Sequence, residues 1–242
     1  MGFLKIFSGF EAVFSKHSEL LWQKRTKKYG KRAKNPLLGL VLTGPCLILL
    51  FVACGSYPKK QNFEEVVSER VEINNPYFSD SSEDYVYKAD IKVFKNSFSG
   101  IFIVKKMGDA HHRIAITTEM GNKLFDFEFE AKKFKINQIL PEMDKKVLIN
   151  VLKRDFLALI EQKPFSTNSY VKGDFEIGET LLFSKKHYYL FDNGLLKKIV
   201  RAGNGKEKVT FLFSEINDNI ANDIQIKHQN IRLEIYLKRL KS

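Results

Sequence analysis

Cysteine is nearly absent from this chain of 242 residues, which holds only Cys46 and Cys54. Residues 55–242 therefore contain no thiol, and they can form neither a disulfide nor a cysteine-based metal site. That part of the chain must be held together by packing alone.

Recognisable catalytic motifs are absent too. The sequence has no Gly-x-Ser-x-Gly elbow, no His-Glu-x-x-His pair and no glycine loop that would cradle a phosphate. The histidines at 111, 112, 187 and 228 are too scattered to indicate a metal site, and each is expected to be a surface or hydrogen-bonded histidine. We expect neither an enzyme nor a bound cofactor or metal.

Charge is absent from residues 35–58, although residues 1–36 carry nine Lys or Arg against two Glu, a net charge of +7. The apolar run 37–53 would span about 26 Å as a helix, less than the ~30 Å core of a bilayer, and Gly44-Pro45 weakens it further. This profile is typical of a secretory signal. Of the total charge of +12, only +5 remains after residue 36, so the basic balance does not indicate nucleic-acid binding.

The apolar run ends in Phe51-Val52-Ala53-Cys54, which resembles the lipobox of bacterial lipoproteins. The resemblance implies signal cleavage between Ala53 and Cys54 and lipid attachment to Cys54, although Phe51 departs from the usual Leu. Several acyl chains, at about 0.8 kcal/mol per buried CH₂, would anchor the chain to a membrane. The alternative is a buried apolar cysteine, which is our interpretation of Cys46.

The domain organisation follows from this start. We expect a basic leader and signal peptide over 1–53, a lipidated cysteine and polar tether over 54–82 with a short helix at 64–71, and one folded domain over 83–242. The pair Lys59-Lys60 stands where an acidic surface-export run would be, and no Asp follows Cys54. Both features favour the periplasmic face of the outer membrane.

Alternating apolar residues predict four strands joined by tight turns over residues 85–93, 101–104, 113–118 and 124–130. In the last of these, Phe125, Phe127 and Phe129 share one face, and Asp126, Glu128 and Glu130 share a face expected to be solvated. Helical spacing follows over 140–161, with Pro141 in the first turn. Six further strands are predicted within 180–237, giving an antiparallel, mainly β (α+β) fold of about ten strands with one central amphipathic helix.

The order of meander, helix and second meander, together with residues 114–127, resembles the LolA/LolB lipoprotein-carrier fold and in particular LolB-like lipoproteins of the Bacteroidota. The resemblance covers about 83–237. It implies an open half-barrel whose concave face holds acyl chains, with Ile114, Ile116, Phe125, Phe127 and Phe129 as lining residues. It also implies a lipoprotein, or a soluble lipoprotein carrier, as the partner. The turns at 107–112 and 119–122 are shorter than the protruding loop of receptor-type members.

Two functions remain open. The first is a lipid-anchored module that binds lipid or lipoprotein acyl chains and acts in lipoprotein localisation. The second is a structural or assembly lipoprotein whose sheet is filled by its own side chains and whose partner is another envelope protein.

Overall fold

The structure is a computed structural model, and it describes residues 55–67, 69–93, 95–131 and 133–240. The apolar run, the proposed cleavage site and Cys54 lie outside these residues. Within them, no helix is both long enough and apolar enough to cross a membrane.

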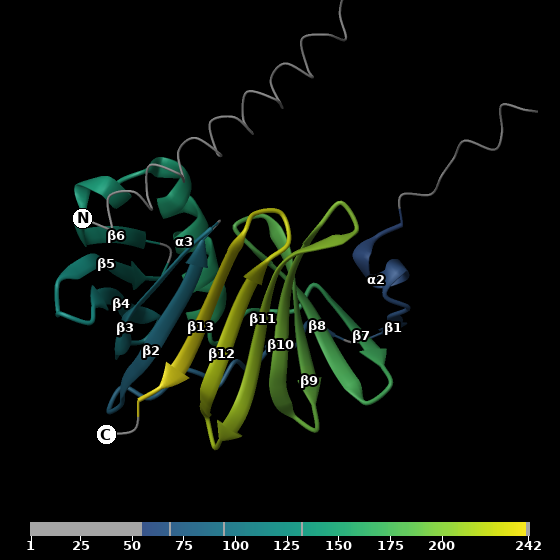
Figure 1. Ribbon diagram of the computed structural model, residues 1–242. Helices are drawn as coiled ribbons and strands as arrows, with labels where there is room; N and C mark the ends of the chain where they lie inside the picture. The colour runs from purple at the N-terminus through teal and green to yellow at the C-terminus, as the bar shows by residue number, and fades with distance from the viewer. Residues whose placement is uncertain (1–54, 68, 94, 132, 241–242) are drawn as a thin grey trace, which may run out of the picture.

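One antiparallel sheet of 13 strands forms the body of the protein, in the order β1-β7-β8-β9-β10-β11-β12-β13-β2-β3-β4-β5-β6. Figure 1 shows it as a curved, open fan with helix α3 on the side of β4–β6 and helix α2 at the other end, beside β7. The strands are β1 Glu64–Val66, β2 Asp84–Val93, β3 Asn96–Gly108, β4 His111–Thr118, β5 Lys123–Glu130, β6 Lys133–Ile139, β7 Asn168–Lys172, β8 Phe175–Leu182, β9 Lys185–Asp192, β10 Leu195–Gly203, β11 Lys206–Asn217, β12 Ile220–His228 and β13 Leu233–Arg239.

Alternation places the apolar side chains of the central strands on one face. In β2, Tyr85, Tyr87, Ala89, Ile91 and Val93 are all buried, and the residues between them are exposed or half-buried. The same period of two holds in β13, where Leu233, Ile235 and Leu237 are buried. The sheet therefore has one continuous apolar face, which is concave and carries the core. The predicted fold class, an open antiparallel sheet with a central helix, is confirmed.

Helix α3, Lys146–Ile160, covers this face. It begins six residues later than the sequence predicted, because Pro141–Met143 forms a separate 3₁₀ turn, η1, and Lys145 is extended. Its buried side chains are Leu148, Val151, Leu152, Asp155, Phe156, Ala158, Leu159 and Ile160.

Residues 57–78 differ from the tether expected there. Residues 57–60 form the short helix α2, Tyr57–Lys60, and β1 pairs with β7 where a helix over 64–71 was predicted. Ile73, Tyr77 and Phe78 are buried in the main core. Residues 64–66 are polar because β1 is the edge strand of the sheet, whereas residues 73–78 contribute to the core.

A second apolar cluster holds α2 against the outer face of the sheet. Tyr57, which is 4% exposed, packs on Tyr188 with ring centroids 4.9 Å apart, and its hydroxyl donates to Oε1 of Glu207 at 2.7 Å. Tyr170, Ile177 and Val200 complete the cluster. The first described residues are thereby fixed to strands β7–β11.

Candidate functional site

The residues predicted to line a lipid cavity all lie on the concave face. Phe125, Phe127 and Phe129 of β5 and Ile114 and Ile116 of β4 are each 3% exposed or less. In the register of the sheet, Ile114 pairs with Phe127 and Ile116 with Phe125. The structure therefore brings the five together on one face and places them inside a packed core, and their role in lining a lipid cavity stays a prediction.

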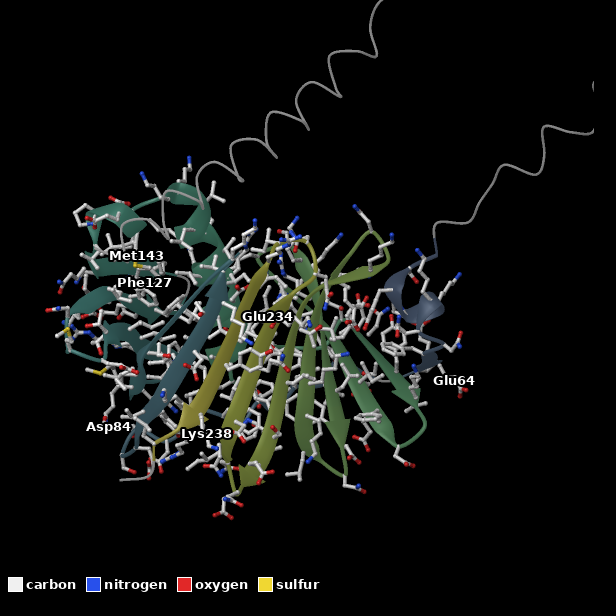
Figure 2. The ribbon with its side chains drawn as sticks, viewed as in Figure 1. Glu64, Asp84, Phe127, Met143, Glu234 and Lys238 are labelled. Atoms are coloured by element: carbon white, nitrogen blue, oxygen red, sulfur yellow. The ribbon has the colours of Figure 1, made fainter. Side chains whose placement is uncertain are left out.

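Aromatic packing fills the space between β5 and the helix. The rings of Phe125 and Phe127 stack with centroids 4.4 Å apart, and Phe156 of α3 lies 5.6 Å from Phe125 and 6.5 Å from Phe127. Phe134 of β6 closes the far side, 5.3 Å from Phe127. Figure 2 labels Phe127 and Met143 in this part of the molecule, on the side of β4–β6.

A small apolar cleft remains under the first half of α3. Its volume is about 40 Å³, and all its described lining residues are apolar. Met143, Leu148 and Leu152 line it from η1 and α3, and Ile116 and Phe125 line it from the sheet. Sites for drug-sized ligands measure about 300–1,000 Å³. An acyl chain could enter only if the helix moved.

The two ends of α3 are held differently. At the C-terminal end, Nδ2 of Asn75 donates to the carbonyl oxygens of Leu159 and Glu161, each at 3.0 Å, and the backbone nitrogen of Asn75 donates to the carbonyl of Gln162 at 2.8 Å. At the N-terminal end, the N-cap position is extended and its side chain makes no capping hydrogen bond. The loop around Asn75 thus fixes the last turn, while the first turns rest on the sheet and the cleft.

One buried polar contact joins α3 to the sheet beside the apolar core. Nε2 of His228 in β12 is 2.8 Å from Oδ2 of Asp155 in α3, and both side chains are 1% exposed. Sequence reasoning missed this pair. The sequence did contain one indication of it. Asp155 is the only carboxylate of the helix, and it lies on the same apolar face as Leu148, Leu152 and Leu159.

The outer face of β5 is less solvated than predicted. Asp126 is 1% exposed because Arg113 donates to both its oxygens, at 2.8 and 2.7 Å, and Lys123 donates at 2.9 Å. The hydrogen bonds from Arg113 are the main reason that the pKa of Asp126 falls to about 2. Glu128, which is more open, hydrogen-bonds His111 at 2.8 Å. These carboxylates are satisfied ion-pair partners with no acid–base geometry.

The other histidines are dispersed. His112 is buried and hydrogen-bonds the carbonyl of Phe78 at 3.0 Å, and His187 is buried in β9 with its Nδ1 on the carbonyl of Lys185 at 2.9 Å. Among the described residues, no group of three or more His, Cys, Asp or Glu side chains is arranged to hold a metal ion.

The chain resembles known proteins in its three-dimensional structure and not in its sequence. No protein-family model and no curated protein sequence matches the chain. A LolA superfamily protein from Nitrosomonas europaea matches with a TM-score of 0.46 at 8% identity, over 69% of this chain and 88% of that one. A DUF1329 family protein from Desulfovibrio piger matches with a TM-score of 0.39 at 10% identity, over 68% and 86%.

A third solved structure is a domain assigned to outer membrane lipoprotein sorting, from Vibrio parahaemolyticus. It matches with a TM-score of 0.37 at 10% identity, over 68% of this chain and 86% of that one. A LolA superfamily protein is thus among the solved structures to which this chain is similar. At TM-scores this low the likeness carries no argument about function, and the fold class rests on the sheet and helix described above.

Proposed function

We propose that the protein is an envelope lipoprotein, anchored by lipid on Cys54, that binds acyl chains of a lipid or lipoprotein between its concave face and α3. It would act at the periplasmic face of the outer membrane in lipoprotein localisation, receiving its ligand from a soluble carrier. The observation that carries the proposal is the wholly apolar cleft under the first half of α3. An acyl chain needs a dry apolar wall along its whole length.

The attachment of α3 supplies the route of entry. Because Asn75 pins the last turn and Asp155 the middle, the first two turns are the part that can lift. Lifting them would expose Leu148, Leu152 and Phe125 and lengthen the cleft along β4 and β5. In the ligand-free state the first turns of α3 bury these residues, so the concave face stays shielded from water until an acyl chain takes the place of those turns.

Native mass spectrometry tests ligand binding. Residues 55–242, secreted behind a cleavable signal and purified without detergent, should carry co-purified lipid in stoichiometric amount. A clean mass of the protein alone, at every level of expression, would reject the acyl-binding role. The anchor is tested separately with radioactive palmitate, which should label the full chain and not its Cys54→Ala variant.

A specific observation favours the second function, a structural or assembly lipoprotein with no ligand cavity. The cleft measures only about 40 Å³, and Phe127 is fully buried among Phe125, Phe134 and Phe156. If the sheet is simply filled, Phe127→Ala should cost about 3–5 kcal/mol of folding free energy without any effect on lipid content.

If the face is a binding site, Phe127→Ala should lose bound lipid together with a smaller part of its stability. Phe165→Ala is the matched control, since Phe165 is 50% exposed. It should retain both stability and lipid.

A further inference from the structure

A basic pocket of about 720 Å³ lies at one rim of the domain; like the apolar cleft it borders the first half of α3, but the two share no described lining residue. It is bounded by the first half of α3, the β8–β9 turn, the end of β10, the start of β11 and the β12–β13 loop. Its described lining residues include no Asp or Glu. The cations among them are Lys153, Arg154, Lys185, Arg201 and Lys208.

Two of these cations are half-buried, and each has one buried donor atom without a partner in the described part of the chain. The Nε atoms of Arg154 and Arg201 are both inaccessible to solvent, and neither has a hydrogen-bond partner among the described residues. Burial lowers the pKa of Arg201, the charge of Arg154 lowers it further, and Asp155 opposes both effects. The hydrogen bond of Asp155, however, goes to His228.

This arrangement is costly unless something fills it. A guanidinium stays charged in a protein, and a buried donor that lacks a partner costs about 1–3 kcal/mol. Two such groups around one pocket also repel each other. Both costs disappear if an anion with several oxygen acceptors enters, because guanidinium groups bind phosphate oxygens through parallel hydrogen bonds.

We propose that this pocket binds a phosphate group, held by Arg154 and Arg201 at its floor and by Lys153, Lys185 and Lys208 around it. The position of Gly55, the first described residue and the neighbour of Cys54, favours a lipid headgroup as the source. The backbone oxygen of Gly55 lies against Gly205, in the turn that follows the pocket residues of β10, only 2.4 Å from where a Cβ would be. If Cys54 carries lipid as proposed, the pocket is held at the membrane surface.

The rim also has the composition of a membrane interface. Phe183, 45% exposed in the β8–β9 turn, and Val147, 42% exposed on α3, line the same pocket as the lysines. The ammonium group of Lys153 lies 5.2 Å from the centroid of the Phe183 ring. Apolar side chains beside basic ones suit the boundary between headgroups and acyl chains.

Calorimetric titration of the full chain in a nonionic detergent tests the pocket. One arm adds inorganic phosphate, and the other adds phosphatidylglycerol in mixed micelles of the same detergent. Arg154→Gln/Arg201→Gln should weaken binding at least about tenfold, since charge-assisted hydrogen bonds are lost. Lys88→Gln/Lys238→Gln is the control, because it removes two cations that pair across β2 and β13 on the outer face.

A melting curve without ligand separates binding from folding. Loss of the repulsion between the two guanidinium groups should leave the melting temperature of the arginine variant unchanged or raised, whereas a purely structural role would lower it. Tighter binding of phosphatidylglycerol than of phosphate, lost only in the arginine variant, identifies a headgroup. Equal affinities identify a site for free phosphate.

Absence of binding in both arms, or equal loss in both variants, overturns the proposal. The phosphate arm is independent of the proposed acyl site, because inorganic phosphate has no acyl chain.

Discussion

His228 and Asp155 lie 73 residues apart in sequence and join β12 to α3 by a 2.8 Å hydrogen bond where the apolar core meets the basic pocket. Both side chains are 1% exposed. The pair fixes the position of the helix along the sheet, because sliding it by one turn would leave both polar groups buried without partners.

A double-mutant cycle should expose this pairing. Asp155→Leu and His228→Leu should each cost about 1–3 kcal/mol, because each leaves the other group buried and unsatisfied. The double variant should cost clearly less than the two losses together. Urea unfolding at neutral pH measures all four free energies. Simple additivity would mean that the contact does not hold the helix.

His187 should make stability depend on pH. Burial lowers the pKa of its imidazole to about 4, aided by Arg201 and opposed by its bond to the carbonyl of Lys185 and by Asp155, whereas the unfolded value is 6.5. Between these values the unfolded chain binds a proton that the folded chain does not. The folded state therefore loses up to about 3 kcal/mol as pH falls from 6.5 to 4.

His187→Gln should flatten that part of the profile when unfolding is measured at pH 7, 6, 5 and 4.5. His111→Gln, which removes a half-buried histidine of β4, is the control. An unchanged slope in His187→Gln would contradict the assignment. The lowered pKa of Asp126 affects stability in a more acidic range, because its contribution is lost as the pH falls from 3.8 through about 2.

Gly205 should hold the start of the described chain in place. Gly205 and Gly194 both have positive φ, at 66° and 75°, so Ala at either position suffers the same backbone strain. Only at Gly205 would the added Cβ also meet the oxygen of Gly55, whereas at Gly194 it would meet open space. Gly205→Ala should therefore release residues 55–60 to protease several-fold faster than Gly194→Ala. Equal cleavage of the two variants would refute this docking.

The strands that the sequence predicted are those with one buried face. β2, β4 and β5 alternate because their apolar side chains meet the core. The three strands that were missed, β1, β6 and β7, are the two edges of the sheet and the neighbour of one edge. All residues of β1 and most of β6 are exposed or nearly so, so little apolar alternation exists to be detected.

The candidate site was predictable in part. The shared face of Phe125, Phe127 and Phe129 follows from the period of two, but its occupation by Phe156 depends on how α3 crosses the sheet. The basic pocket could not be foreseen, since Arg154 and Arg201 come from a helix and a strand that meet only in the folded chain. The tether was mispredicted because Tyr57 and Tyr77 pack from a polar segment.

Binding of a fluorescent fatty acid tests whether an acyl site lies under the first half of α3. Leu148→Trp should plug the cleft, because Leu148 is 5% exposed and lines it, and Met143→Trp provides a second plug from η1. Leu195→Trp, at a 42% exposed position at the start of β10, controls for the added indole. Melting curves confirm that each variant is folded.

The measurement is a titration of residues 55–242 with the fatty acid, followed by fluorescence. The unmodified protein and Leu195→Trp should bind one equivalent of fatty acid with the same affinity. Leu148→Trp or Met143→Trp should weaken binding at least about tenfold, which corresponds to about two methylenes of the fatty acid that are no longer buried. Absence of saturable binding in the unmodified protein, or equal binding by the plugged and control variants, would show that no acyl site lies under the helix.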